Sequence, residues 1–278
     1  SQSFIPWMNY NNNFRTGFDI SVNTYRKIGD FEFSLGMNYT FYTTKATKRD
    51  ELYTDYRQRE GKPVDGIWGY ESAGLFQSQE EIDAWPTQNL GSTVRPGDIK
   101  YIDQNKDGVV NSNDQIYLGK GGWYGNPATM GVNLTLKYKS FTLFGLATAG
   151  TGAWGVKNSS YYWVDGEDKY SAVVRDRWTP ETAATAKYPR LTVTEGANNF
   201  VTSDFWMYNT SRIDIAKLQL TYDMPQSVLA GNKVVKGFSA YISGSNLLTI
   251  SPERKHMEMN VGSAPQSRFY NFGVKLVF

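Results

Sequence analysis

Long runs of alternating apolar and polar residues constrain this chain more than any other feature. The alternation is clearest in residues 15–24, 31–41, 129–138 and 267–278. Successive side chains of a β-strand point to opposite faces, so each run predicts a strand with one apolar and one polar face. Runs of about ten residues are longer than typical soluble strands and match a tilted membrane crossing. Three further segments complete a set of about seven expected antiparallel strands: 141–150, 208–222 and 237–249.

One of these segments changes phase within its length. The apolar residues Ile213 and Ile215 lie at odd positions, whereas Leu218 and Leu220 lie at even positions. A β-bulge inserts one extra residue and shifts the phase by one position. We therefore expect a bulge near Ala216.

The connections between the expected strands alternate between short and long. Short turns lie at 28–30 and 139–140, and a moderate one spans 223–236. Long connections cover about 44–128, 151–207 and 250–266. Outer-membrane β-barrels have this asymmetry, because their periplasmic turns are short and their extracellular loops are long. The pattern predicts an all-β fold, an antiparallel transmembrane β-barrel segment, with these apolar residues facing lipid: Phe18, Ile20, Leu35, Val132, Leu134, Phe272 and Leu276.

Composition agrees with a barrel segment and argues against other classes. Aromatic residues make up 15% of the 278 residues, yet the mean hydropathy is −0.50. A transmembrane barrel combines both properties, since only alternate residues face lipid. A net charge of +2 without a basic run argues against a nucleic-acid partner. The chain has no Cys and one His, His256, which leaves little for thiol or multi-histidine chemistry.

Several motifs give the chain a family resemblance. They are Gly66-Ile67-Trp68-Gly69-Tyr70-Glu71 with Gly74-Leu75-Phe76, Pro96-Gly97-Asp98-Ile99-Lys100-Tyr101, Arg177-Trp178, Tyr188-Pro189-Arg190-Leu191, and Ser245-Asn246-Leu247-Leu248-Thr249. In this order they resemble the SusC/RagA-type TonB-dependent transporters of the Bacteroidetes outer membrane. The resemblance covers essentially the whole chain.

The resemblance carries expectations about the whole protein. It implies that residues 1–278 are the C-terminal part of a barrel of about twenty-two strands, with the plug and the earlier strands lying elsewhere. It also implies import of glycans or peptides across the outer membrane, energised by TonB through the missing N-terminal part. A SusD-like surface lipoprotein would act as a lid. The start at Ser1, without an initiator Met or signal peptide, is expected for a mature chain or a fragment.

The segment Asp103–Asp114 has the ligand spacing of a calcium loop. Its oxygen-bearing side chains fall at positions 1, 3, 5, 9 and 12, a glycine occupies position 6, and a carbonyl serves position 7. The expected Ca²⁺ ligands are Asp103, Asn105, Asp107, Val109, Asn111 and Asp114. Asp at position 12 replaces the longer Glu of the EF-hand pattern. The alternative is an Asx-rich turn that holds its shape through side-chain to backbone hydrogen bonds.

Aromatic residues gather in the long connections. Exposed rings can stack on sugars, and the candidate substrate-binding residues are Trp123, Tyr124, Tyr161, Tyr162 and Trp163. The alternative is that these rings pack the loops together. Trp206 and Tyr208, at the start of the fifth expected strand, are expected in an aromatic girdle.

No motif supports catalysis, so we expect a protein that is not an enzyme. Acidic residues such as Glu80 and Glu81 lack any feature that fixes the separation that glycoside hydrolysis requires. The rival hypothesis is a soluble, secreted all-β carbohydrate-binding module with a structural calcium. It would explain the aromatic residues and the Asp103–Asp114 loop, but not the alternating connection lengths.

Overall fold

The structure of the chain, a computed structural model, describes residues 8–53, 55–122, 125–166, 170–193, 196–231, 234–254 and 267–278. The chain divides into two compact units, which are described separately. The sheet unit comprises Thr16–Thr43, Tyr124–Ala153 and Asn209–Phe278. The loop unit comprises Ser1–Arg15, Thr44–Trp123 and Trp154–Tyr208.

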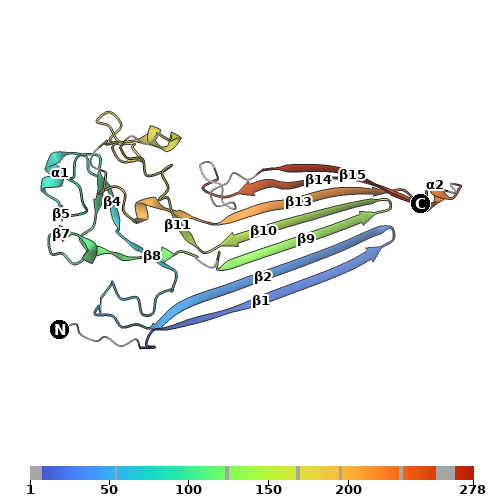
Figure 1. The fold of residues 1–278 in the computed structure, drawn as a ribbon, viewed down its shortest axis with the longest axis horizontal. Coiled ribbons are helices and arrows are strands. Elements are labelled where there is room, and N and C mark those ends of the chain that lie inside the picture. The colour runs from blue at the N-terminus through green and yellow to red at the C-terminus, as the bar shows by residue number, and fades with distance from the viewer. Residues whose placement is uncertain are drawn as a thin grey trace. The chain divides into compact units, whose positions relative to one another are not determined.

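A seven-stranded sheet dominates the sheet unit, in the order β1-β2-β9-β10-β13-β14-β15 (Figure 1). The ladders from β2 to β15 are antiparallel. The strands are β1 (Asn12–Ile28), β2 (Phe31–Lys48), β9 (Ala128–Tyr138), β10 (Phe141–Thr151), β13 (Arg212–Asp223), β14 (Gly237–Ile250) and β15 (Phe269–Val277). The expected all-β fold with a large antiparallel sheet is confirmed.

The register separates an apolar face from a polar face. Tyr39, Met130, Ala149, Ile213 and Ile250 are successive partners across five strands. The neighbouring residue on each strand lies on the opposite face of the sheet. These neighbours are also successive partners, and they are polar or small: Asn38, Gly131, Thr148, Asp214 and Thr249. Because the side-chain period of a strand is two, each row keeps its face along the ladder.

The apolar face of this sheet is not covered by another layer among the residues described. Phe18, Ile20, Phe272 and Leu276 are 50%, 52%, 75% and 49% exposed. Leu35, Val132 and Leu134, the other residues expected to face lipid, are partly exposed. None of the seven is packed into a closed sandwich core.

A bulge in β13 confirms the expected phase change. Leu146 pairs with Lys217, but Ala147 pairs with Ile215, so Ala216 has no partner on β10. On the other side, Ile215 pairs with Leu248 and Lys217 with Ser245, so Asn246 and Leu247 together oppose Ala216. Asn246 has a left-handed backbone, with φ of 56°.

Turns in left-handed conformations close the two short hairpins. Gly29, between β1 and β2, has φ of 58°, and Lys139, between β9 and β10, has φ of 50°. The moderate connection after β13 contains a short helix, α2 (Gln226–Leu229). No helix among the residues described is long and apolar enough to span a membrane.

Short strand pairs build the loop unit. β3 (Gly66–Gly69) pairs with β8 (Ile116–Lys120), and β4 (Ser72–Leu75) pairs with β6 (Ile99–Tyr101), both antiparallel. β5 (Thr87–Gln88) runs parallel to β7 (Val109–Val110), and β11 (Trp154–Val156) lies beside β12 (Met207–Asn209). Three 3-10 helices span Ser112–Asp114, Ala172–Asp176 and Asp204–Trp206.

One helical turn in this unit has a side-chain cap at its N-terminus. α1 (Gln79–Asp83) has Ser78 as its N-cap, and the Ser78 hydroxyl accepts a hydrogen bond from the Glu81 amide at 3.3 Å. Such a cap satisfies one of the amides that have no partner within the helix.

Candidate functional site

Asp98 is the centre of a buried polar network in the loop unit. Its side chain has no exposed surface. It accepts hydrogen bonds from Asn199 Nδ2 and from the Arg95 amide, each at 2.8 Å. Arg190 Nε lies 2.7 Å from Asp98 Oδ1, and Arg190 Nη2 donates to Oδ2 at 3.2 Å. Burial raises the pKa of the Asp98 carboxyl, while the Asn199 hydrogen bond and the Arg190 charge oppose that shift.

Gly97 brings four of the sequence motifs together beside this carboxylate. Its φ of 90° lies in the left-handed region. A Cβ atom here would lie 2.5 Å from Cε3 of Trp178, so only glycine permits the contact. The Gly97 carbonyl accepts from the Arg190 amide, and its own amide donates to the Phe76 carbonyl. The motifs that begin at Gly74, Pro96, Arg177 and Tyr188 therefore meet at one point.

Buried amide side chains complete the hydrogen bonding of β6. Gln88 Oε1 accepts from the Tyr101 amide, and Gln88 Nε2 donates to the Ile99 carbonyl at 3.0 Å and to Asn198 Oδ1 at 2.7 Å. The Ile99 amide donates to Asn199 Oδ1. Gln88, Asn198 and Asn199 are not among the candidate residues predicted from the sequence, because their partners lie about a hundred positions away along the chain.

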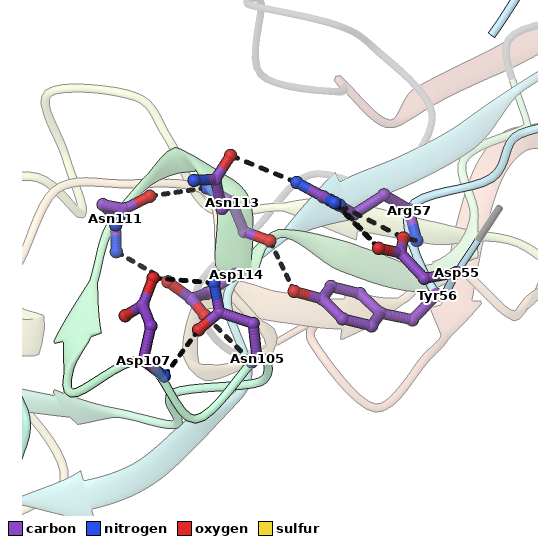
Figure 2. A network of polar contacts seen from close by, with 8 residues as sticks. All are labelled: Asp55, Tyr56, Arg57, Asn105, Asp107, Asn111, Asn113 and Asp114. Atoms are coloured by element: carbon purple, nitrogen blue, oxygen red, sulfur yellow. Dashed lines mark hydrogen bonds and ion pairs between the residues drawn. The ribbon is translucent and has the colours of Figure 1, made fainter. Parts of the chain in front are cut away.

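The Asp103–Asp114 loop closes on itself through side-chain to backbone hydrogen bonds (Figure 2). Asp103 accepts from the amides of Lys106 and Gly108, Asn105 from that of Asp107, and Asp107 from that of Val109. Gly108 has φ of 87°, which permits the sharp reversal.

Asp114 closes the two ends of this loop. It is fully buried. Its Oδ1 accepts from the Gln104 amide at 2.9 Å, and its Oδ2 from the Asn111 amide at 2.7 Å. Asn111 in turn accepts from the Asn113 amide, which gives a capping box around the 3-10 helix Ser112–Asp114. The Asp114 carboxylate is therefore engaged by backbone N–H groups.

A neighbouring segment holds this loop from outside. Tyr56 Oη donates to the Asn113 carbonyl at 2.7 Å, and Arg57 Nη1 donates to Asn113 Oδ1 at 3.1 Å. Asp55 pairs with Arg57 at 2.8 Å, as Figure 2 shows. The guanidinium carbon of Arg57 also lies 4.3 Å from the centre of the Tyr53 ring.

The expected calcium site has its ligand residues gathered in this loop. No group of three or more His, Cys, Asp or Glu side chains placed to hold a metal ion occurs among the residues described. Asp103, Asn105 and Asp107 are all engaged in Asx-type hydrogen bonds, which the alternative predicts. Asx-type bonding accounts for the shape of the loop and leaves calcium binding as a prediction.

The candidate aromatic residues have different environments. Trp123 and Tyr124 lie outside the described residues. Tyr161 is 40% exposed, whereas Tyr162 is 6% exposed. Trp163 packs against Phe200 and Trp206, with ring centres 6.0 and 6.3 Å apart. Of the three described, Tyr161 has the most accessible ring for a ligand.

Packing also explains two neighbouring rings of the loop unit. Tyr188 Oη donates to the Tyr162 carbonyl at 2.8 Å, and burial raises the pKa of Tyr188 to about 12. Trp206 is 3% exposed and donates its indole N–H to the Asn199 carbonyl. The girdle interpretation is therefore wrong for Trp206, because the buried Asn199 carbonyl satisfies its N–H within the loop unit.

Comparison with curated proteins places these motifs in a family context. The chain is 29% identical to TonB-dependent receptor P26 of Formosa agariphila over 239 residues, which cover 78% of this chain and 23% of the relative. It is 26% identical to TonB-dependent receptor P3 of the same organism, over 94% of this chain and 28% of the relative. The chain resembles TonB-dependent receptors. It spans about a quarter of the length of these relatives.

Solved structures share the fold of this chain. The RagAB peptide transporter matches with a TM-score of 0.71 and 19% identity, over 96% of this chain and 29% of that chain. The closed-closed state of the RagAB peptide importer matches with a TM-score of 0.68 and 19% identity, over 96% and 30% of the two chains. No family model matches the chain. The resemblance that the motifs indicated is confirmed.

Proposed function

We propose that this chain is the C-terminal part of a TonB-dependent β-barrel transporter of the outer membrane. The observation that carries the proposal is the sheet with one exposed apolar face. Phe18, Ile20 and Phe272 are each at least half exposed on long strands. Exposed apolar patches of this extent mark interaction or membrane surfaces. A bilayer covers such a face, whereas water would not favour it.

The free edges of the sheet support its being part of a larger barrel. Among the residues described, β1 and β15 each have one neighbour in the sheet. Backbone groups at a membrane depth need hydrogen-bond partners, and a closed barrel supplies them. Further strands would therefore pair with β1 and β15 in the complete protein.

The complete protein would import an oligosaccharide or a peptide rather than transform it. Import would be energised by TonB, acting through parts beyond this chain, and a SusD-like lipoprotein would cover the extracellular side. The similarity to a peptide transporter supports this class of function. The exposed ring of Tyr161 is the described residue best suited to contact such a substrate.

The rival carbohydrate-binding module is less well supported. A soluble all-β module buries the apolar faces of its sheets against each other. Here Ile20, Leu218 and Val274 are 52%, 44% and 51% exposed. The relatives are receptors, which also favours the transporter.

The transporter predicts which segments reach the cell surface. Epitope tags inserted in the loop unit, for example after Gly61, should be labelled on intact cells. Tags at Gly29 or after Ser140 should be labelled only after the outer membrane is permeabilised, because short turns face the periplasm. Labelling of the turns on intact cells, with protected loop tags, would overturn the proposal.

A further inference from the structure

A groove of about 660 Å³ crosses the apolar face of the sheet unit. Its floor follows one row of the register, from Tyr39 through Met130 and Ala149 to Ile213 and Ile250. Ala149, the smallest side chain in this row, lies between the larger side chains of Met130 and Ile213. The groove is therefore part of the pleated surface itself.

Hydroxyl groups gather along one side of the groove. Thr151, Ser211 and Ser251 line it just beyond the apolar row. The Thr151 and Ser211 hydroxyls lie 2.6 Å apart, and Arg212 also lines this side. The sites that hold small ligands are mostly apolar, with a few placed polar groups that fix orientation. The groove has this character, with its polar groups on one side only.

We propose that this groove binds one acyl chain of a membrane lipid, with the lipid head beside Thr151, Ser211 and Ser251. The inference rests on the proposed function, which places this face of the sheet in hydrocarbon. A void beside Ala149 would forfeit dispersion contacts along its lining, and only a flexible chain can fill it from the bilayer. The one-sided hydroxyl groups match an amphiphile, which has one polar end.

The shape of the groove and its hydroxyl groups distinguish a lipid bound there from the other lipids around the protein. Another hollow of the sheet, around Leu143, has a volume of about 250 Å³, well under half that of the groove. A lipid in the groove would have contacts on both flanks and hydrogen bonds at its head. It should therefore stay with the protein when the surrounding lipid is exchanged for detergent.

The test is native mass spectrometry of the full transporter, purified from outer membranes in detergent. The unmodified protein should retain one lipid. Ala149→Trp places a large ring on the floor of the groove and should abolish retention. Ala147→Trp is the matched control, because Ala147 has the same strand and face but does not line the groove. It should retain the lipid.

A milder pair of changes tests the head contacts without filling the groove. Thr151→Val combined with Ser211→Ala removes both hydroxyls with little change in volume, and retention should fall roughly thirtyfold if each hydrogen bond contributes about 1 kcal/mol. Absence of a retained lipid from the unmodified protein, or equal retention in the Ala149 and Ala147 variants, would overturn the proposed lipid site. Membrane fractionation of the same cells tests the proposed function separately. A protein that is missing from the outer membrane would contradict that function itself.

Discussion

Asp98 combines a charge with complete burial, and its partners explain why the arrangement persists. Arg190, Asn199 and the Arg95 amide all donate to it or pair with it. A charge in such a position is costly unless every lone pair is satisfied. Because its partners come from segments far apart in sequence, this carboxylate ties the loop unit together.

Removing this carboxylate should destabilise the loop unit. Asp98→Ala removes the buried carboxylate that Arg190, Asn199 and the Arg95 amide share, and loss of one partner of a buried ion pair typically costs about 3–5 kcal/mol. Limited proteolysis should then cleave within residues 60–120 much faster than in the unmodified protein. Asp55→Ala, which removes an exposed partner of Arg57, is the control and should change little. Equal protease resistance of the two variants would contradict the tying role of Asp98.

Calcium binding by the Asp103–Asp114 loop is also tested with changes of single residues. If Ca²⁺ binds, calorimetry of the intact protein should give calcium-dependent heat at about 10⁻⁴–10⁻³ M, the range of extracellular modules. Asp103→Ala with Asp107→Ala should remove that heat and loosen the loop, without unfolding the sheet. Ser112→Ala is the control, because Ser112 lies in the same loop and outside the predicted ligand set. No calcium-dependent heat would leave the Asx-turn alternative.

At the scale of elements, the bulge at Ala216 shows how far the pattern of alternation reaches. The phase change between Ile215 and Leu218 predicts its position, and the register confirms it. The matching irregularity at Asn246 and Leu247 could not be predicted, since Ser245–Thr249 gave no clear phase. Asn tolerates the left-handed conformation better than most residues, which explains its position here.

This conformation gives a test of the bulge. Asn246→Gly should leave stability nearly unchanged, because glycine adopts a φ of 56° without strain. Asn246→Val should lower stability by about 1–3 kcal/mol, because a β-branched residue is strained there. Thermal unfolding in detergent measures both. A valine variant as stable as the glycine variant would contradict the left-handed assignment.

The short strands of the loop unit lie beyond sequence-based prediction. β5 and β7 have two residues each, too few to show any period. The buried network at Asp98 depends on contacts between residues about a hundred positions apart, which no local pattern encodes.

At the scale of the whole molecule, strand length and connection length were enough to predict the sheet. The all-β class and the exposed apolar set follow from the period of two. The substrate does not follow, because Tyr162 and Trp163 turn out to pack within the loop unit. Ring-rich loops have the same composition whether their rings bind sugars or each other.

The central claim is that the apolar face of the sheet lies in hydrocarbon, and nitroxide scanning along β9 tests it most directly. Spin labels placed singly at 129 to 136 in the full transporter, reconstituted in bilayers, should alternate in their accessibility to oxygen. Labels at Met130, Val132, Leu134 and Leu136 should be reached by oxygen and protected from a water-soluble nickel chelate, because oxygen partitions into lipid. Labels at Thr129, Gly131, Asn133 and Thr135 should show lower oxygen accessibility. Access of the chelate to the apolar set, or the absence of any period of two, would contradict the account.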